Sequence, residues 1–108
     1  MMRRARITLT ALALIVPFFA VMPAASAAPL CDGLEATIVG DDGPNTLHGT
    51  GLDDVIAGLG GDDVIVGGGG NDVICGGNGD DIMLGSDGDD TLLGGNGVDT
   101  AGYGNAPG

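Results

Sequence analysis

The stretch GGNGDDIML, from Gly76 to Leu84, places two adjacent aspartates in a glycine-rich segment and follows them with three apolar residues. Glycine accepts the positive φ values of tight turns and leaves room for backbone oxygens to converge. Three apolar residues after such a turn are typical of a short strand whose middle side chain points inward. The stretch therefore predicts a turn that ends at Asp81 and a strand whose central residue, Met83, enters a core.

The same pattern recurs every nine residues. From Gly40 to Gly102 the chain reads as seven consecutive units without an insertion. The first position is always glycine, the fourth is glycine except at Leu52, and the eighth is always apolar. The sixth position holds Asn45 in the first unit and aspartate in the others: Asp54, Asp63, Asp72, Asp81, Asp90 and Asp99. Positions that keep the same type of residue through seven consecutive units indicate a repeat architecture.

Composition limits both the partners and the core of this chain. It contains 15 acidic residues, and its only 3 basic residues lie within the first six positions. Such a surface repels nucleic acid and anionic lipid, and it attracts cations. After Ala28 the only aromatic residue is Tyr103. A short chain with so few large side chains cannot build a conventional core, so something besides hydrophobic burial must stabilise it.

Units four to six match the pattern G-G-x-G-x-D-x-U-x nearly letter for letter. The chain resembles the RTX, or haemolysin-type, calcium-binding repeat family, over about four fifths of the residues after Ala28. The resemblance implies an all-β fold, a parallel β-roll (a right-handed β-solenoid) of about seven nonapeptide repeats. Units one, two and seven depart from the pattern, among other places at Pro44, Leu52 and Val98.

Calcium is the cofactor that the turns are expected to bind. In a roll, alternate units stack about 4.8 Å apart, which predicts one carboxylate stack of Asp63, Asp81 and Asp99 and another of Asp54, Asp72 and Asp90. Calcium takes about six to eight oxygen ligands, whereas magnesium demands strict octahedral geometry. The expected ligands are these six aspartates together with Gly58, Gly67, Gly76, Gly85, Gly60, Gly69, Asn78 and Asp87.

The fifth position carries a second aspartate in four units: Asp53, Asp62, Asp80 and Asp89. Other units have Asn71, Val98 or Pro44 there, so this side chain is not expected to be an essential ligand. We predict a solvated, charge-balancing role for it. A transition metal would favour histidine or thiolate, and the only histidine is His48.

The first 27 residues resemble an export signal. A basic start, MMRRAR, precedes the apolar stretch ITLTALALIVPFFAVM and the small residues AASAAP, which suit cleavage between Ala27 and Ala28. A membrane anchor is the alternative, but the stretch is short for one and contains Pro17. The expected organisation is a signal peptide (1–27), an N-terminal capping segment (28–39), the repeats (40–102) and a C-terminal tail (103–108), in a protein that is secreted or held in the cell envelope.

Cys31 and Cys75 are the only cysteines, and export favours their oxidation to a disulfide. Cys75 occupies an outward ninth position, where the capping segment could reach it. A free thiol or a link between two chains is the alternative.

The predicted function is that of a secreted calcium-binding protein in which calcium binding is coupled to folding, and not that of an enzyme. After Ala28 the chain has one serine, Ser86, and one histidine, His48, and paired carboxylates catalyse only inside a water-excluding pocket. Two alternatives remain: a structural or adhesive cell-surface spacer, and an ice-binding solenoid. The second would need a flat row of outward threonines.

The outer face of the roll is expected to carry an apolar patch of Val64, Val66, Ile82 and Leu84, from seventh and ninth positions. Branched residues suit strands for local reasons, but a contiguous exposed apolar patch tends to mark a contact surface. We therefore predict that this face contacts a second copy, an envelope component or the termini of the chain. Beyond calcium ions, no nucleic-acid partner and no membrane insertion after signal cleavage are expected.

Overall fold

The structure is a computed structural model that describes residues 27–104. Within this range the chain forms only strands, turns and bends. The ten strands are β1 (Leu30–Cys31), β2 (Leu34–Glu35), β3 (Ile38–Val39), β4 (Thr46–His48), β5 (Val55–Ala57), β6 (Val64–Gly68), β7 (Val73–Asn78), β8 (Ile82–Ser86), β9 (Thr91–Asn96) and β10 (Thr100–Gly102). The predicted export signal, apart from Ala27, and the last residues of the tail lie outside the described range.

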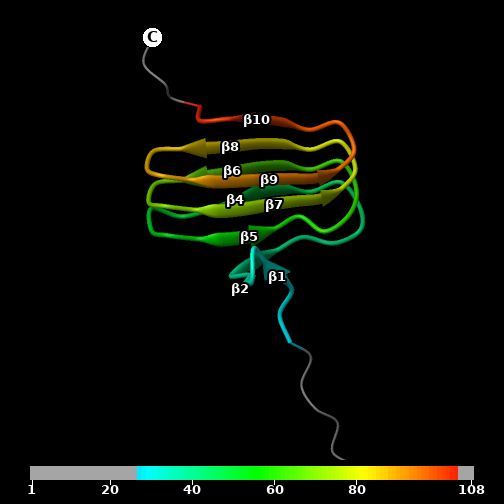
Figure 1. The fold of residues 1–108 in the computed structure, drawn as a ribbon, viewed down its shortest axis with the longest axis horizontal. Helices are drawn as coiled ribbons and strands as arrows, with labels where there is room; N and C mark the ends of the chain where they lie inside the picture. Colours follow the sequence, from blue (N-terminus) through cyan, green and yellow to red (C-terminus); the bar gives the residue numbers. More distant parts are fainter. Residues whose placement is uncertain (1–26, 105–108) are drawn as a thin grey trace, which may run out of the picture.

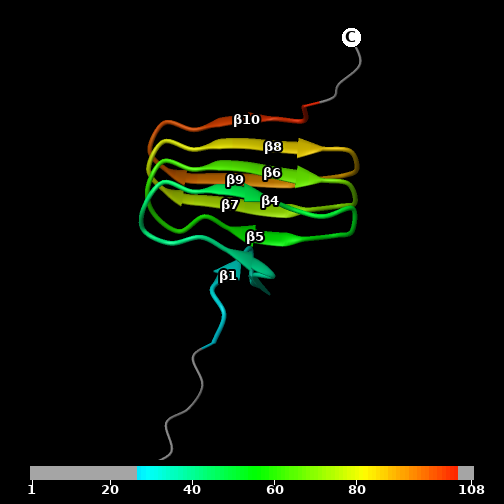
Figure 2. The same cartoon turned by 180° about the vertical axis from the view of Figure 1, so that it is seen from behind.

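Strands β3 to β10 form two four-stranded parallel sheets that face each other (Figure 1). One has the order β10-β8-β6-β4 and is called the β4 sheet below; the other has the order β3-β5-β7-β9 and is called the β5 sheet. Successive strands alternate between the sheets, so each pair joins residues eighteen apart, such as Val55 and Val73. Seen from behind, the strands of the β4 sheet lie one above another in the same order (Figure 2). The chain is therefore a β-solenoid of about 4 turns, which confirms the predicted β-roll.

The solenoid begins earlier than the repeat pattern does. Strand β3 precedes Gly40 and pairs with β5, with Ile38 opposite Ile56. Ile38 therefore takes the place of an eighth-position residue, although the segment before it lacks the turn glycines of a repeat. The last residues of the predicted capping segment (28–39) thus form the first strand of the roll.

The core lies between the two sheets and consists of the eighth-position side chains. Ile56, Ile65, Ile74 and Met83 are buried, and Ile38, Leu47 and Leu92 pack against them. Burying each large apolar side chain contributes about 1.5–3 kcal/mol, so this single row of residues makes a small core. Ala101, in the last strand, is exposed.

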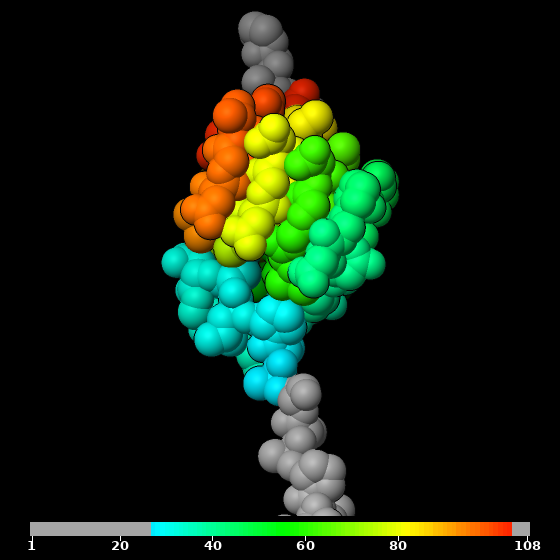
Figure 3. Space-filling model, turned by 90° about the vertical axis from the view of Figure 1, so that its right-hand side faces the viewer, coloured from blue at the N-terminus to red at the C-terminus, as the bar shows by residue number. Residues whose placement is uncertain are grey.

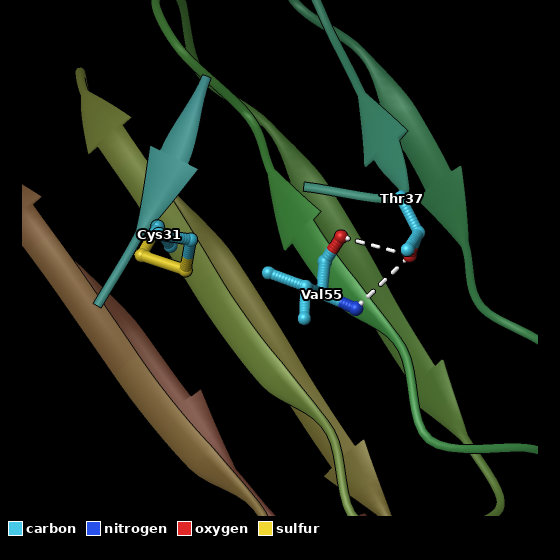
Figure 4. The surroundings of a disulfide bond; sticks show 4 residues. Cys31, Thr37 and Val55 are labelled. Carbon is cyan, nitrogen blue, oxygen red and sulfur yellow. Dashed lines mark hydrogen bonds between the residues drawn. A yellow bond between two sulfur atoms is a disulfide. The ribbon is translucent and has the colours of Figure 1, made fainter. Parts of the chain in front are cut away.

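The N-terminal hairpin of β1 and β2 packs against the outer face of the β5 sheet. Cys31 is fully buried and forms a disulfide with Cys75 of β7, as predicted (Figure 4). Nearby, the Thr37 hydroxyl both donates to the Val55 carbonyl and accepts from the Val55 amide, each at 3.1 Å. The outer face of the β4 sheet is different, because Val64 and Ile82 remain 37% and 45% exposed there. Their predicted outward direction is confirmed; a contact through them stays a prediction.

Candidate metal sites in the turns

The turns stack along the two edges of the roll. Figure 3 shows one edge, where the turns of units one, three, five and seven (residues 40–45, 58–63, 76–81 and 94–99) form adjoining columns from teal to orange. The turns of units two, four and six (49–54, 67–72 and 85–90) belong to the other edge, because successive strands alternate between the sheets. One coil of the solenoid consists of two strands with their turns, which is eighteen residues.

Sixth-position residues are joined along each stack by hydrogen bonds. The backbone amide of Asp54 donates to Oδ1 of Asp72 at 2.8 Å, and that of Asp72 donates to Oδ1 of Asp90 at 2.9 Å. On the other edge the amide of Asp63 donates to Oδ1 of Asp81 at 2.8 Å, and that of Asp81 donates to Asp99 at 2.9 Å. The two predicted carboxylate stacks therefore form, with backbone amides between their members.

The second carboxylate oxygen of these aspartates is left without a partner. Oδ2 is buried and accepts no hydrogen bond in Asp63, Asp72, Asp81 and Asp90. The first three of these residues are only 1% exposed. A buried, unpaired carboxylate oxygen is costly in free energy, so these four atoms favour either a positive partner or protonation of the carboxylate.

The first-position glycines lie directly against these oxygens. A Cβ at Gly58 would collide with Oδ2 of Asp63 in its own unit and would lie 2.6 Å from the carbonyl oxygen of Gly76, one coil further along. Gly67 is placed in the same way against Asp72 and the carbonyl of Gly85. Each of these glycines is required because a carboxylate oxygen and a carbonyl oxygen occupy the space that a side chain would fill.

Burial changes the acidity of the stacked carboxylates. Desolvation raises the pKa of Asp63, Asp72 and Asp81 above the usual value for aspartate, and backbone hydrogen bonds oppose this in part. Neighbouring carboxylates add to the rise, as Asp81 does for Asp63. A cation at the turns would favour the ionised forms and so oppose both the burial and the repulsion.

The donors at these turns are hard oxygen atoms. Within residues 27–104, no group of three or more His, Cys, Asp or Glu side chains is placed to hold a metal. A metal ion here would therefore take backbone carbonyl oxygens in addition to carboxylates, which is the ligand type that calcium prefers. Both cysteines are used in the disulfide, and His48 is exposed on β4.

The fifth-position side chains have a structural role that was not foreseen. Oδ1 of Asp53 accepts the backbone amide of Asn71 at 2.7 Å, and Oδ1 of Asn71 accepts that of Asp89 at 2.9 Å. Asp62 and Asp80 accept in the same way on the other edge. The expectation of a solvated, charge-balancing role was incomplete, because these exposed side chains also join successive coils. The signal for this role in the sequence was that both aspartate and asparagine occur at the fifth position.

Comparison with known proteins agrees with this geometry. The family model described as the RTX calcium-binding nonapeptide repeat matches residues 37–51, 48–83 and 76–105, in 4 copies. The chain belongs to this family. Its RTX repeats form a calcium-binding β-roll, and Ca²⁺ is their cofactor. The match begins at residue 37, just before β3. No curated protein and no solved structure matches the chain.

Proposed function

We propose that this protein is a secreted calcium-binding protein whose β-roll folds as its turns bind calcium. The observation that carries the proposal is the row of buried, unpartnered Oδ2 atoms of Asp63, Asp72, Asp81 and Asp90. These oxygens converge with carbonyls only in the folded roll. Free energy of calcium binding is therefore available to folding.

The charge of the chain supports the same coupling. After the first six residues there is no Lys or Arg to balance the 15 acidic residues. Folding without calcium would stack carboxylates along both edges of the roll, and their repulsion opposes a compact state. Calcium bound at the turns would supply positive charge there.

The proposed carboxylate ligands are Asp63, Asp72, Asp81, Asp90 and, at the last turn, Asp99. The proposed carbonyl ligands include those of first-position glycines: Gly76 and Gly85 present a carbonyl oxygen to the turns of units three and four, one coil earlier. The carbonyls of Gly58 and Gly67 face the turns of units one and two in the same way. The third-position residues predicted from sequence, Gly60, Gly69, Asn78 and Asp87, remain proposed ligands through their backbone oxygens.

Secretion is supported by the sequence and by the family. RTX repeat proteins are typically secreted, and the Cys31–Cys75 disulfide suits an oxidising compartment. Residues 27–104 contain no helix that is long and apolar enough to cross a membrane. N-terminal sequencing of protein from the culture medium should begin at Ala28, and an intact Met1 would contradict the proposed cleavage.

Equilibrium dialysis against labelled calcium tests the proposed binding. We expect several calcium ions per chain, retained in a large excess of magnesium because magnesium fits flexible carbonyl-rich sites poorly. Magnesium that displaces all of the calcium would contradict the proposal.

The alternative functions, which are catalysis, a surface spacer and ice binding, differ in their support. RTX β-solenoids are typically non-catalytic structural domains, and we propose no reaction. A surface spacer would use the same calcium-stiffened roll, and its location on the producing cell would distinguish it. An ice-binding face is disfavoured, because Val64 and Ile82 stand between Thr46 and Thr100 across the β4 sheet.

A further inference from the structure

The turns fall into two classes of backbone conformation. In units three to seven the second and fourth residues all have positive φ, from 75° at Ser86 to 112° at Gly88. In units one and two, the residues at these positions lie outside the positive-φ region: Asp41, Gly43, Thr50 and Leu52. We call the first class open turns and the second class closed turns.

Local sequence explains the closed turn of unit two. Positive φ is unfavourable for a residue with a Cβ, and most of all for a β-branched one. Thr50 and Leu52 stand where units four, five and seven have glycine at both positions. Leu59 and Ser86 show that a side chain without a branch at Cβ is still accommodated at the second position of an open turn, with φ of 78° and 75°.

Closed turns satisfy the oxygen that open turns leave unpaired. In unit two, Oδ2 of Asp54 accepts the backbone amide of Thr50 at 2.6 Å and the Thr50 hydroxyl at 2.9 Å. In unit one, Oδ1 of Asn45 accepts the backbone amide of Asp41 at 2.8 Å. In the open turns of units three to six, the corresponding Oδ2 has no partner.

We infer that units one and two bind no calcium through their sixth residues, and that the calcium sites of the roll begin at unit three. The second and fourth residues of each unit determine whether its turn is open or closed. Because a closed turn needs only a hydrogen-bond acceptor, the neutral Asn45 serves in unit one. Asp54, expected from sequence to be a ligand, is reassigned to a structural role. The inference rests on the proposed calcium binding.

The position of the closed turns should determine where folding of the roll begins. They lie at the N-terminal end, beside the hairpin that the Cys31–Cys75 disulfide fixes to β7. This end is thus held by hydrogen bonds and a covalent link, while the rest depends on the metal. Growth of the folded roll should proceed from the closed turns toward the C-terminus as calcium is added.

Asp54→Asn and Asp72→Asn form the decisive pair, because both residues belong to one stack and both changes remove one charge. Asparagine at 54 retains an acceptor for Thr50, as Asn45 does for Asp41. We expect Asp54→Asn to bind the same number of calcium ions as the wild type, with a folding midpoint within about twofold. Asp72→Asn should bind fewer ions and shift the midpoint by about tenfold or more. Equal losses in the two variants would overturn the inference.

A converse experiment adds a site. Thr50→Gly with Leu52→Gly should open the turn of unit two and raise the calcium count by one, and adding Asp54→Asn in that background should remove the gain. Circular dichroism at saturating calcium checks that each variant is folded. A folded double-glycine variant with an unchanged count would overturn the role of these two positions. A wild-type chain that binds no calcium would instead refute the proposed function.

Discussion

In the sixth-position aspartates of the open turns, the two carboxylate oxygens have different roles. Oδ1 accepts a backbone amide from the previous coil, whereas Oδ2 has no partner in Asp63, Asp72, Asp81 and Asp90. An amide side chain can replace the first oxygen without loss, but it cannot offer a negative charge at the second. Under the proposed calcium binding, the aspartates are therefore needed for the metal rather than for the hydrogen-bond ladder.

Substitutions of the neighbouring residues Asp80 and Asp81 test directly whether the charge or the hydrogen bond of the aspartate matters. Asp81→Asn should raise the calcium concentration at the folding midpoint by about tenfold or more, because it removes the buried charge of a proposed ligand. Asp80→Asn loses the same charge on the surface but retains an acceptor for the amide of Val98, so its shift should stay within about twofold. Titration with calcium, followed by circular dichroism, measures both. A larger shift for Asp80→Asn would contradict the assignment.

The raised pKa of Asp63, Asp72 and Asp81 predicts how acid affects the calcium-free chain. Burial raises each pKa above its value of 3.8 in the unfolded chain. Protonation thus stabilises the fold below that value, and this stabilisation is lost as pH rises through the folded pKa. Calcium-free protein taken from pH 7 toward about pH 4 should gain β-structure, whereas protein in limiting calcium should lose bound ions, since protons compete for its ligands. A calcium-free chain that gains no β-structure on this titration would show that burial does not control the ionisation of these carboxylates.

At the scale of the element, the turn depends on glycine for space as well as for conformation. A Cβ at Gly76 would collide with Oδ2 of Asp81 and would lie 2.9 Å from the carbonyl oxygen of Gly94. Its φ is not positive, so any substitution there is opposed by sterics alone. At Gly51, by contrast, a Cβ would meet no atom within 4 Å.

These two glycines provide a matched pair of alanine substitutions. Gly76→Ala should destabilise the calcium-loaded roll by about 1–3 kcal/mol, because the turn must move away from the added methyl group. Gly51→Ala should be neutral or stabilise by up to about 1 kcal/mol, because alanine restricts the unfolded chain. Denaturant unfolding at saturating calcium gives both values. Equal costs would mean that the oxygens do not converge on Gly76.

Much of this architecture could be predicted from the period alone. A nine-residue spacing fixes which side chain enters the core, so Ile56, Ile65 and Met83 were placed correctly, and it fixes which carboxylates stack. Strand β3 was missed because Cys31 and Leu34 stand where a repeat that ends at Val39 would have its first-position and fourth-position glycines. The closed turn was not foreseen either: Leu52 breaks the pattern visibly, but the bonds from Thr50 to Asp54 depend on backbone angles that a sequence motif does not specify.

At the scale of the whole molecule, the two outer faces differ in what covers them. The N-terminal hairpin shields Ala57 and Cys75 on the β5 sheet, while Val64 and Ile82 on the β4 sheet stay exposed. Ile82 is 45% exposed and its neighbour Met83 is 1% exposed, so adjacent residues point to opposite sides of one strand.

Substituting this pair with threonine tests the assignment of the faces. Met83→Thr should cost about 2 kcal/mol or more through lost packing, whereas Ile82→Thr should change stability by about 0.5 kcal/mol or less. If the outer face contacts a second copy, Ile82→Thr should also reduce self-association in sedimentation velocity. A severe folding defect in Ile82→Thr with a stable Met83→Thr would reverse the two faces.

Calcium-coupled folding is the central proposal for the whole roll, and far-ultraviolet circular dichroism tests it most directly. The chain without its predicted export signal is compared in chelator, in millimolar calcium and in millimolar magnesium. We predict a mostly disordered spectrum in chelator, a β-rich one in calcium, and little recovery in magnesium. A spectrum that is equally β-rich in chelator and in calcium would contradict calcium-coupled folding.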